Sequence, residues 1–388
     1  MRVAFYAPLK APDHPVPSGD RCVAQLFGAA LRTAGHEVFL ASRFRSYDGC
    51  GDRLRQVRLA SVGVALAERF LRRCREQPAT APELWFTYHV YHKAPDWLGP
   101  TIAEALRIPY VIAEASDAPK QASAEWGIGR EAALRAIRRA DAVIGVNPAD
   151  RGCIMPLLRD PSRWVAIKPF LDTALFGRRP RSTPTAPRLI AIAMMRHGDK
   201  LASYRILGKA LSRLLDLPWC LEVVGDGPAR NQVEGALAPL RGRVIWSGVL
   251  APEEIRERLA SADLFVWPAL NEAYGMAALE AQASGLPVVA GIAGGIREIV
   301  TSGITGLLVP PGDAQAFAAA VHSLIVDRDK RVAFAKAARQ RVQSEHDLSV
   351  AANRLAITID AVRQAYGHAP SHALPPALGR EWAGAYGL

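Results

Sequence analysis

Two glutamates eight positions apart, Glu272 and Glu280, have the clearest capacity for binding chemistry in this sequence. They lie in the stretch "NEAYGMAALEAQASGLPVVAGIAGGIREIV", residues 271–300, before and after the start of an expected helix over residues 276–283. Carboxylates are strong acceptors for paired hydroxyl groups, and the backbone N–H groups at a helix start bind phosphate. The spacing has two possible explanations, the ordinary punctuation of an α/β fold and a site that binds a sugar nucleotide.

Each glutamate also has a purely structural explanation. Glu272 would cap the helix and Glu280 would be an exposed helical charge, but Glu280 stands among apolar residues, a poor setting for a charge without a function. We expect Glu272 to accept hydrogen bonds from sugar hydroxyls and Glu280 to hold the ribose. The backbone N–H groups expected to face a phosphate are those of Tyr274, Gly275, Met276 and Ala277.

Two cations are expected beside the diphosphate of such a ligand. Arg196 and Lys200 lie in "AMMRHGDKLASYRILGKAL", at the end of the first strand of the second half of the chain. Cations there would neutralise a diphosphate as it leaves. The alternative is ordinary surface charge, which fits Arg205 and Lys209 better because they fall inside the next helix.

A glycine turn, "VVGDGP" at residues 223–228, is the third part of this site. Gly225 and Gly227 would let a nucleotide base or a phosphate approach the backbone closely. The turn is a weak signal by itself, because strand–glycine–helix turns are common.

Alternating strand and helix patterns position these residues. The order predicts two successive parallel sheets covered by helices, and ligands of such sheets bind at the carboxyl ends of the strands. With two domains, the cleft between them is the default site. Strands are expected at residues 2–7, 37–41, 84–88, 110–113 and 142–146, and then at 189–193, 221–224, 244–246, 264–267, 287–290 and 306–309.

The pattern breaks around residues 169–188, where "GRRPRSTPTAPR" is rich in Pro, Arg and Thr and typical of a linker. We expect one Rossmann-like domain over residues 1–172 and another over residues 173–345. Residues 346–388 would form a C-terminal helix and tail that cross back to the first domain.

Composition narrows the class of protein. The 388 residues carry no apolar run long enough to span a bilayer, and the N-terminus begins at once as a strand, without a signal peptide. None of the five cysteines forms a C-x-x-C pair, which favours a reducing cytoplasm and argues against a structural zinc site.

The net charge of +11 leans toward the first half of the chain. Residues 1–170 carry 24 Lys and Arg against 17 Asp and Glu, or +7, and residues 171–388 carry 24 against 20, or +4. This suggests an anionic acceptor or an anionic membrane surface, although an arginine-rich solvated surface explains the excess equally well. The basic segment 52–77 could rest on a membrane, but a surface helix that covers the sheet is the commoner case.

The second half resembles the family-4 retaining glycosyltransferases of the GT-B fold. Glu272 and Glu280 match the E-x7-E pattern of that family, and "VVGDGP", "ASGLPVVA" and "GGIREIVTSGITGLLVPPGD" resemble its other segments, nearly continuously over residues 189–340. The resemblance implies that Glu272 binds the donor sugar, Glu280 the ribose, and Arg196 and Lys200 the diphosphate, without a metal. The Asp-x-Asp at residues 327–329 is interpreted as a surface cap.

The first half resembles the family less closely. "PSGDRCVAQLFGAALRTAGHEV" is similar to its glycine loop and first helix, with Gly19-Asp20 in place of Gly-Gly. Gly19 would approach the donor diphosphate, and Asp20 is a candidate helix cap. The histidine that the family carries after the strand "PYVIAEASDAP" is missing. The first-domain residue that contacts the reacting sugar is therefore His89, His92 or Glu114, the histidines being equally well explained as packed loop residues.

The sequence thus predicts a GT-B enzyme of two doubly wound Rossmann-like domains facing across a cleft. The expected activity is retaining, metal-independent transfer of a hexose from a nucleotide sugar to a hydroxyl of a sugar, lipid-linked or other acceptor, in glycan, glycolipid or polysaccharide biosynthesis. No cofactor and no nucleic acid are expected, and the location is cytoplasmic, with peripheral contact at the inner face of the membrane. The alternatives are a phosphate-dependent glycan or disaccharide phosphorylase and a non-catalytic protein that binds nucleotide sugars.

Overall fold

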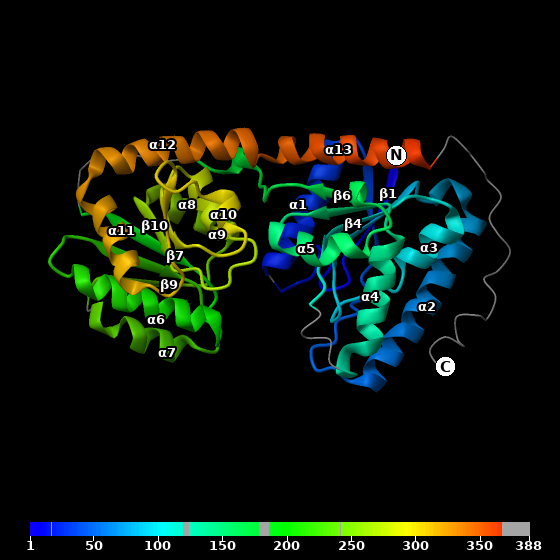
Figure 1. The fold of residues 1–388 in the computed structure, drawn as a ribbon, viewed down its shortest axis with the longest axis horizontal. Helices are drawn as coiled ribbons and strands as arrows, with labels where there is room; N and C mark the ends of the chain where they lie inside the picture. The colour runs from blue at the N-terminus through cyan, green and yellow to red at the C-terminus, as the bar shows by residue number, and fades with distance from the viewer. Residues whose placement is uncertain (17, 119–123, 178–185, 241, 367–388) are drawn as a thin grey trace. The chain divides into compact units, whose positions relative to one another are not determined.

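The chain folds into two compact units, which we describe from a computed structural model (Figure 1). The structure describes residues 1–366 except 17, 119–123, 178–185 and 241. Unit 1 comprises Met1–Ile167 and the chain from Ala351 onward, and unit 2 comprises Lys168–Val350. Much of the expected linker and the whole of the expected tail after residue 366 lie outside the described residues.

Unit 1 is built on a parallel six-stranded sheet with the order β2-β1-β3-β4-β5-β6. Apolar residues of the four inner strands are almost fully buried, as expected where helices cover both faces of a parallel sheet, and those of the two edge strands are partly exposed. The strands are β1 (Arg2–Tyr6), β2 (Glu37–Ser42), β3 (Leu84–Val90), β4 (Tyr110–Ala115), β5 (Ala142–Gly145) and β6 (Trp164–Ala166).

Strand β6 is not predicted by the sequence pattern, because it has only three residues and no alternation. It pairs with β5, and the pairing depends on Gly145. A Cβ atom there would lie 2.0 Å from the ring of Trp164.

The helices of unit 1 pack their apolar faces on this sheet. Asp52 accepts hydrogen bonds from the N–H groups of Leu54 and Arg55 and so caps α2, whose buried face includes Phe70 and Leu71. This basic segment is therefore a helix packed on the core of unit 1. The helices are α1 (Gly19–Thr33), α2 (Arg53–Glu76), α3 (Gly99–Leu106), α4 (Gly127–Arg139), α5 (Arg151–Ile154) and, from residue 351 on, α13 (Leu348–Ala365).

Unit 2 has a second parallel six-stranded sheet, with the order β12-β11-β10-β7-β8-β9. Its strands are β7 (Arg188–Ile192), β8 (Cys220–Val224), β9 (Val244–Gly248), β10 (Leu264–Trp267), β11 (Val288–Gly291) and β12 (Gly306–Val309). Its helices are α6 (Asp199–Leu211), α7 (Arg230–Leu237), α8 (Pro252–Ser261), α9 (Met276–Ala283), α10 (Ile296–Ile299), α11 (Ala314–Val326) and α12 (Arg328–Glu345).

Two parallel sheets covered by helices confirm the expected doubly wound architecture. Within the part of the chain that the structure describes, no helix is both long and apolar enough to cross a bilayer.

Candidate active site

The predicted residues of unit 2 follow three strands that are neighbours in the sheet, β10, β7 and β8. Because the strands are parallel, their carboxyl ends meet at one edge. Glu272 follows β10, Arg196 and Lys200 follow β7, and the glycine turn follows β8. The topology thus brings the three predicted parts of the site to the same edge of the sheet.

Glu272 is held by two side chains from two different strand ends. Lys200 Nζ donates to Glu272 Oε2 at 2.5 Å, and Trp267 Nε1 donates to the same oxygen at 3.3 Å. The Lys200 ammonium also lies 5.5 Å from the centre of the Trp267 ring. The side chains of Glu272 and Lys200 are 20% and 26% exposed, so the pair is shielded but reachable by a ligand.

The loop that carries Glu272 is tied to the first turns of α6. Ser203 Oγ accepts from the Leu270 N–H at 3.1 Å, and Asn271 Nδ2 donates to Asp199 Oδ2 at 3.0 Å. Asn271 has a φ of 52°, a left-handed conformation that Asn tolerates better than most residues. With the Lys200 contact, three consecutive loop residues are anchored to one helix, which fixes the position of the Glu272 carboxylate.

Glycines support the other side of this loop. A Cβ atom at Gly294 would lie 2.3 Å from the carbonyl oxygen of Glu272, and one at Gly295 would lie 2.5 Å from that of Ala273. The Gly295 N–H donates to the Ala273 carbonyl at 3.0 Å. These glycines therefore let the next loop of the sheet pack directly on the backbone beneath Glu272.

The glycine turn after β8 makes a similar backbone contact with the end of β7. Gly225 and Gly227 have φ values of 135° and 153°, and a Cβ atom at Gly225 would lie 2.0 Å from the Ala193 carbonyl oxygen. The Met195 N–H donates to the Asp226 carbonyl at 2.9 Å. The turn therefore holds the loop that leads to Arg196.

Glu280 is the fifth residue of α9 and is half-buried. Burial raises its pKa from 4.5 to about 7, against a small opposite effect of the Arg256 charge. Its carboxylate accepts no hydrogen bond from the residues that the structure describes. A ligand with paired hydroxyl groups would supply the missing donors.

The start of α9 has no side-chain cap. Gly275 precedes the helix with a φ of 74°, and the Glu272 side chain turns away from the helix to Lys200. The idea that Glu272 caps the helix is therefore wrong.

Met276 and Ala277 are the first two residues of α9, and the first N–H groups of a helix have no hydrogen-bond partner within it. Tyr274 precedes them and is half-buried, and the Arg196 side chain is exposed.

In unit 1, His89 pairs with Asp20. His89 Nδ1 lies 3.0 Å from Asp20 Oδ1, which joins the end of β3 to the first turn of α1. Burial raises the pKa of Asp20, but the hydrogen bond and charge of His89 outweigh it, so that the pKa is lowered. The helix begins at Gly19 and its cap is Ser18, whose side chain accepts from the Arg21 N–H. Asp20 is therefore not the cap.

Glu114 lies near the end of β4, the next strand of the sheet. Its Oε1 accepts from the Val146 N–H at 2.6 Å. Burial raises the Glu114 pKa to about 7, although the Val146 hydrogen bond and the His89 charge lower it. Both Glu114 and His89 have left-handed φ values, 61° and 65°. Such strain costs non-glycine residues of the order of 1–3 kcal/mol and clusters at functional sites.

His92 has different surroundings from His89. Its ring packs edge-on against Trp126 and Tyr91, with centroids 5.7 and 5.4 Å away. Its Nε2 is buried and has no hydrogen-bond partner among the described residues, and burial lowers its pKa. The structure therefore brings Asp20, His89 and Glu114 to one edge of the sheet and places His92 in an aromatic cluster beside α4.

Several contact residues escape sequence reasoning. Trp267, Asp199 and Ser203 position Glu272 and its loop, yet a buried Trp at a strand end and polar residues in a first helical turn have common structural explanations. No sequence pattern predicts the pairing of Asp20 with His89, since the two residues are far apart in sequence.

The cap expected at residues 327–329 is present, because Asp327 accepts from the Lys330 N–H. Within the described ranges, no three His, Cys, Asp or Glu side chains converge as a metal site.

Comparison with known proteins shows a family resemblance in unit 2. Residues 186–327 match the model of the glycosyl transferases group 1. Over 123 residues the chain is 37% identical to the sulfoquinovosyl transferase SQD2 of Arabidopsis thaliana, covering 31% of this chain and 24% of that protein. It is 30% identical over 255 residues to a D-inositol 3-phosphate glycosyltransferase of Kineococcus radiotolerans, covering 58% of each chain. The chain spans less than two thirds of the length of these curated relatives.

Solved structures extend the likeness to nearly the whole chain. Sucrose-phosphate synthase from Thermosynechococcus elongatus superposes with a TM-score of 0.70 at 22% identity, over 94% of this chain and all of that one. Anabaena HepE in complex with UDP superposes with a TM-score of 0.69 at 18% identity, over 93% of this chain. The fold is GT-B, as the sequence predicts. Residues 186–327, the segment that matches the model of the glycosyl transferases group 1, hold every candidate residue of unit 2.

Proposed function

We propose that this protein is a retaining glycosyltransferase that moves a hexose from a nucleotide sugar to an acceptor hydroxyl. The observation that carries the proposal is the contact of Lys200 with Glu272 at the edge formed by β7 and β10, with Glu280 on the helix that follows the Glu272 loop. The named relatives act in sugar transfer, and HepE has been solved with UDP-glucose, so UDP-sugars are the first donors to test.

Glu272 would bind the sugar of the donor, and Lys200 would bind its diphosphate. A lysine ammonium has three N–H donors, and one of them is on Glu272. The other two remain for oxygens of a diphosphate, while the second Glu272 oxygen accepts from sugar hydroxyls. The ion pair thus sets the distance between sugar and diphosphate before the donor arrives.

Glu280 would bind the ribose. Two ribose hydroxyls donate best to an ionised carboxylate, and the raised pKa means that burial within the protein disfavours this form. Donor binding would therefore lower the Glu280 pKa. Because the carboxylate has no partner among the described residues, the donor displaces none.

The leaving diphosphate would be stabilised by Arg196, Lys200 and the N–H groups at the start of α9. Fixed positive groups aimed at developing negative charge are the main source of catalysis in such a site. The departing oxygen would take the proton of the acceptor hydroxyl on the same face of the sugar. Configuration is then retained without a protein nucleophile or a metal.

Unit 1 would supply the acceptor side, with Gly19 near the diphosphate. Asp20, His89 and Glu114 are the groups that we propose for contacts with the reacting sugar, since they share one sheet edge. The acceptor would be a sugar or a lipid-linked hydroxyl in glycan, glycolipid or polysaccharide synthesis. We place the enzyme in the cytoplasm, in peripheral contact with the inner face of the membrane.

Sugar transfer by Glu272→Ala and Glu272→Gln tests the proposal. With a UDP-sugar panel and sugar acceptors, both variants should lose transfer by about a hundredfold or more, as expected when a contact to the reacting sugar is removed. The control is Glu253→Gln on α8, whose side chain is 73% exposed. The Glu272→Gln variant separates a lost charge from a lost side chain.

NMR of the first product formed determines its anomeric configuration. The sugar-transfer assay repeated with EDTA tests whether the reaction requires a metal. Retained configuration and undiminished turnover are expected. Full activity of folded Glu272→Ala would refute the assignment, and inverted product or loss of activity with EDTA would refute the mechanism alone.

A further inference from the structure

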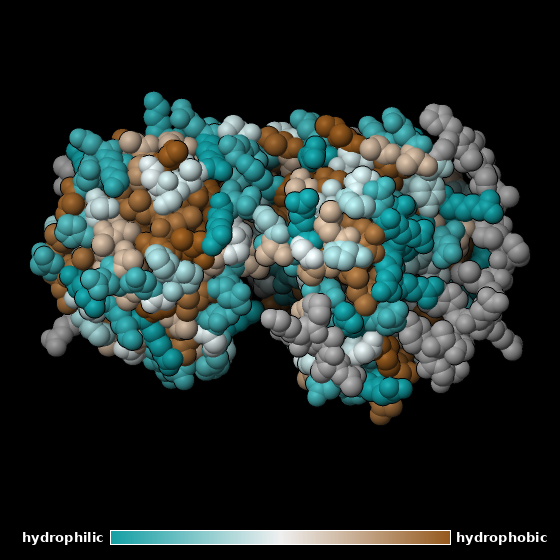
Figure 2. All heavy atoms as spheres, in the orientation of Figure 1, coloured by the Kyte–Doolittle hydropathy of each residue, from teal (hydrophilic) through white to brown (hydrophobic). Residues whose placement is uncertain are grey.

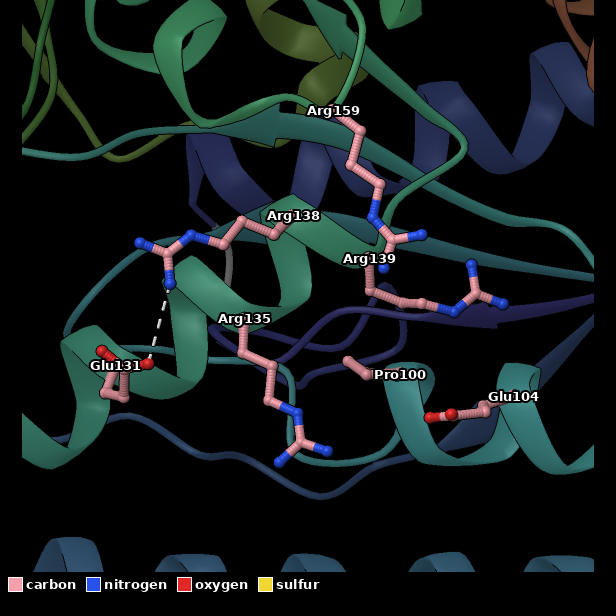
Figure 3. Close-up of a pocket in the computed structure, with 7 residues that line it drawn as sticks. All are labelled: Pro100, Glu104, Glu131, Arg135, Arg138, Arg139 and Arg159. Carbon is pink, nitrogen blue, oxygen red and sulfur yellow. Dashed lines mark ion pairs between the residues drawn. The ribbon is translucent and has the colours of Figure 1, made fainter.

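Unit 1 contains an arginine-rich pocket between α3 and α4 (Figure 3). Its volume is about 280 Å³, and among the described residues that line it only Pro100 is without a charge. The charged lining consists of Glu104, Glu131, Arg135, Arg138, Arg139 and Arg159. Four guanidinium groups against two carboxylates give the pocket an excess of two positive charges.

Helical spacing places three of these arginines on one face. Residues 135, 138 and 139 are three and four positions apart on α4, so their side chains emerge on the same side. Arg159 comes from a separate segment, the loop before β6, and is exposed. Figure 2 shows hydrophilic side chains over much of α4.

The arginines differ in how firmly they are held. Arg139 donates to Asp141 Oδ2 at 3.0 Å and to the Tyr366 hydroxyl at 2.7 Å. Arg138 turns to Glu131, with a long ion pair of 3.8 Å (Figure 3). Arg159 forms no ion pair with any residue that the structure describes. The pocket therefore has one fixed guanidinium, that of Arg139, and two, those of Arg138 and Arg159, whose charge is only weakly compensated.

Helix electrostatics account for part of this cluster. Cations in the last turn of a helix interact favourably with its dipole, which explains Arg138 and Arg139. This effect fades within one turn, so it does not explain Arg135, and it does not apply to Arg159, which lies outside the helix. Arginines from two different elements, α4 and the loop before β6, thus line the same pocket.

The pocket extends to the opposite edge of the sheet from Glu114 and His89. Asp141, the partner of Arg139, donates its N–H to the Tyr110 carbonyl, at the amino end of β4. Glu114 lies near the carboxyl end of the same strand. The pocket is therefore a separate feature from the candidate active-site residues of unit 1.

We propose that this pocket binds a compact ligand with two or more phosphate groups. Guanidinium groups are planar forks that match phosphate oxygens and bind them in pairs. The volume lies at the small end for ligand pockets, and almost every described lining residue carries a charge, so the pocket suits a compact and highly charged ligand. The phosphates come either from a soluble oligophosphate or from lipid headgroups, and the two sources are separable by experiment.

Titration calorimetry with inorganic tripolyphosphate tests the site on the full chain. Arg135→Gln combined with Arg159→Gln should lose one bound tripolyphosphate per chain or weaken its binding by about tenfold or more, the effect of losing charge-assisted hydrogen bonds. The matched control combines Arg205→Gln with Arg213→Gln, which removes the same charge from unit 2. Replacing the two pocket arginines by lysine keeps the charge without the fork and should give intermediate affinity.

Sedimentation with phosphatidylcholine vesicles, with and without phosphatidic acid, is the second arm. Vesicle binding that needs Arg135 and Arg159, without tripolyphosphate binding, supports the site and identifies lipid headgroups as its ligand. The reverse result supports a soluble oligophosphate. The proposal is overturned if the pocket variant binds tripolyphosphate and vesicles as well as the parent and the control do. It is also overturned if the pocket and control variants lose the same amount of binding. Circular dichroism melts verify that each variant is folded.

Discussion

The carboxylates of Glu272 and Glu280 lie in one short segment but have opposite surroundings. Glu272 is paired with Lys200 at 2.5 Å and with the Trp267 N–H, so its charge is already compensated. Glu280 accepts no hydrogen bond from the described residues, and burial raises its pKa to about 7 against the smaller opposite effect of the Arg256 charge. At the residue scale, Glu272 is pre-organised as a charged acceptor, whereas Glu280 is costly to ionise unless a hydrogen-bond donor or a positive charge binds it.

This cost predicts a pH-dependent effect of Glu280→Gln on stability. The folded protein binds the Glu280 proton more tightly than the unfolded chain, because the pKa is 4.5 unfolded and about 7 folded. Stability therefore falls as pH rises between these values and levels off above 7. Relative to the parent, Glu280→Gln should gain up to about 1–3 kcal/mol in free energy of unfolding between pH 4.5 and 8.

Urea unfolding followed at pH 4.5, 6 and 8 measures this difference. Glu234→Gln on α7 is the control and should show no such rise. A difference between Glu280→Gln and the parent that stays constant with pH would show that Glu280 ionises freely in the folded protein.

At the element scale, the turn after β8 depends on glycine. Replacing Gly225 by Ala brings a Cβ atom to 2.0 Å from the Ala193 carbonyl at a φ that L-residues rarely adopt. We expect a loss of about 2–4 kcal/mol in stability, as for other mutations that combine strain and steric clash, with weaker donor binding because the loop to Arg196 shifts.

Gly235→Ala is the matched control for this substitution. A Cβ atom at Gly235 meets nothing within 4 Å, and the residue lies inside α7. Alanine there should stabilise by up to about 1 kcal/mol. Thermal melts with and without UDP measure both effects, and equal melting temperatures for the two variants would contradict the clash.

Much of unit 2 is predictable from the sequence, since its elements follow strong local patterns. The structure has α9 at Met276–Ala283, β10 at Leu264–Trp267 and β12 at Gly306–Val309, as predicted. The position of Glu272, Lys200 and the glycine turn at one sheet edge follows from parallel topology. What the pattern does not contain is the Lys200–Glu272 contact, which depends on side-chain geometry across two loops.

Unit 1 was less predictable for a physical reason. The left-handed backbone of His89 and Glu114 is imposed by tertiary packing, because glutamate does not favour this conformation and even histidine adopts it only uncommonly. The sequence pattern does not distinguish His89 from His92, which lie three positions apart. In the structure, His89 pairs with Asp20 and His92 packs on Trp126.

At the scale of the whole molecule, unit 1 is discontinuous in sequence and unit 2 is continuous. Helix α13 buries Leu355, Ile359 and Val362 in unit 1. Each such side chain contributes about 1.5–3 kcal/mol, against a total stability of about 5–15 kcal/mol for a domain. A chain that ends at Val350 should therefore keep a folded unit 2 and lose most of the stability of unit 1.

Hydrogen exchange on the chain ending at Val350 measures each unit separately. Protection should collapse in β1 to β6 and persist in β7 to β12, and the calorimetric transition should split or shrink. Unchanged protection of the unit 1 strands would show that α13 is dispensable for that core.

Because unit 1 is discontinuous in sequence, the two units cannot complete their folding in the order in which their first residues are synthesised. A ribosome that has made residue 167 must add the whole of unit 2 before the unit 1 part of α13 begins at residue 351. At about 5–20 residues per second this takes roughly 10–40 s, time in which unit 2 can fold while the first sheet waits. The apolar surface that α13 will cover is exposed throughout this interval, so nascent unit 1 is the part of the chain most in need of a chaperone.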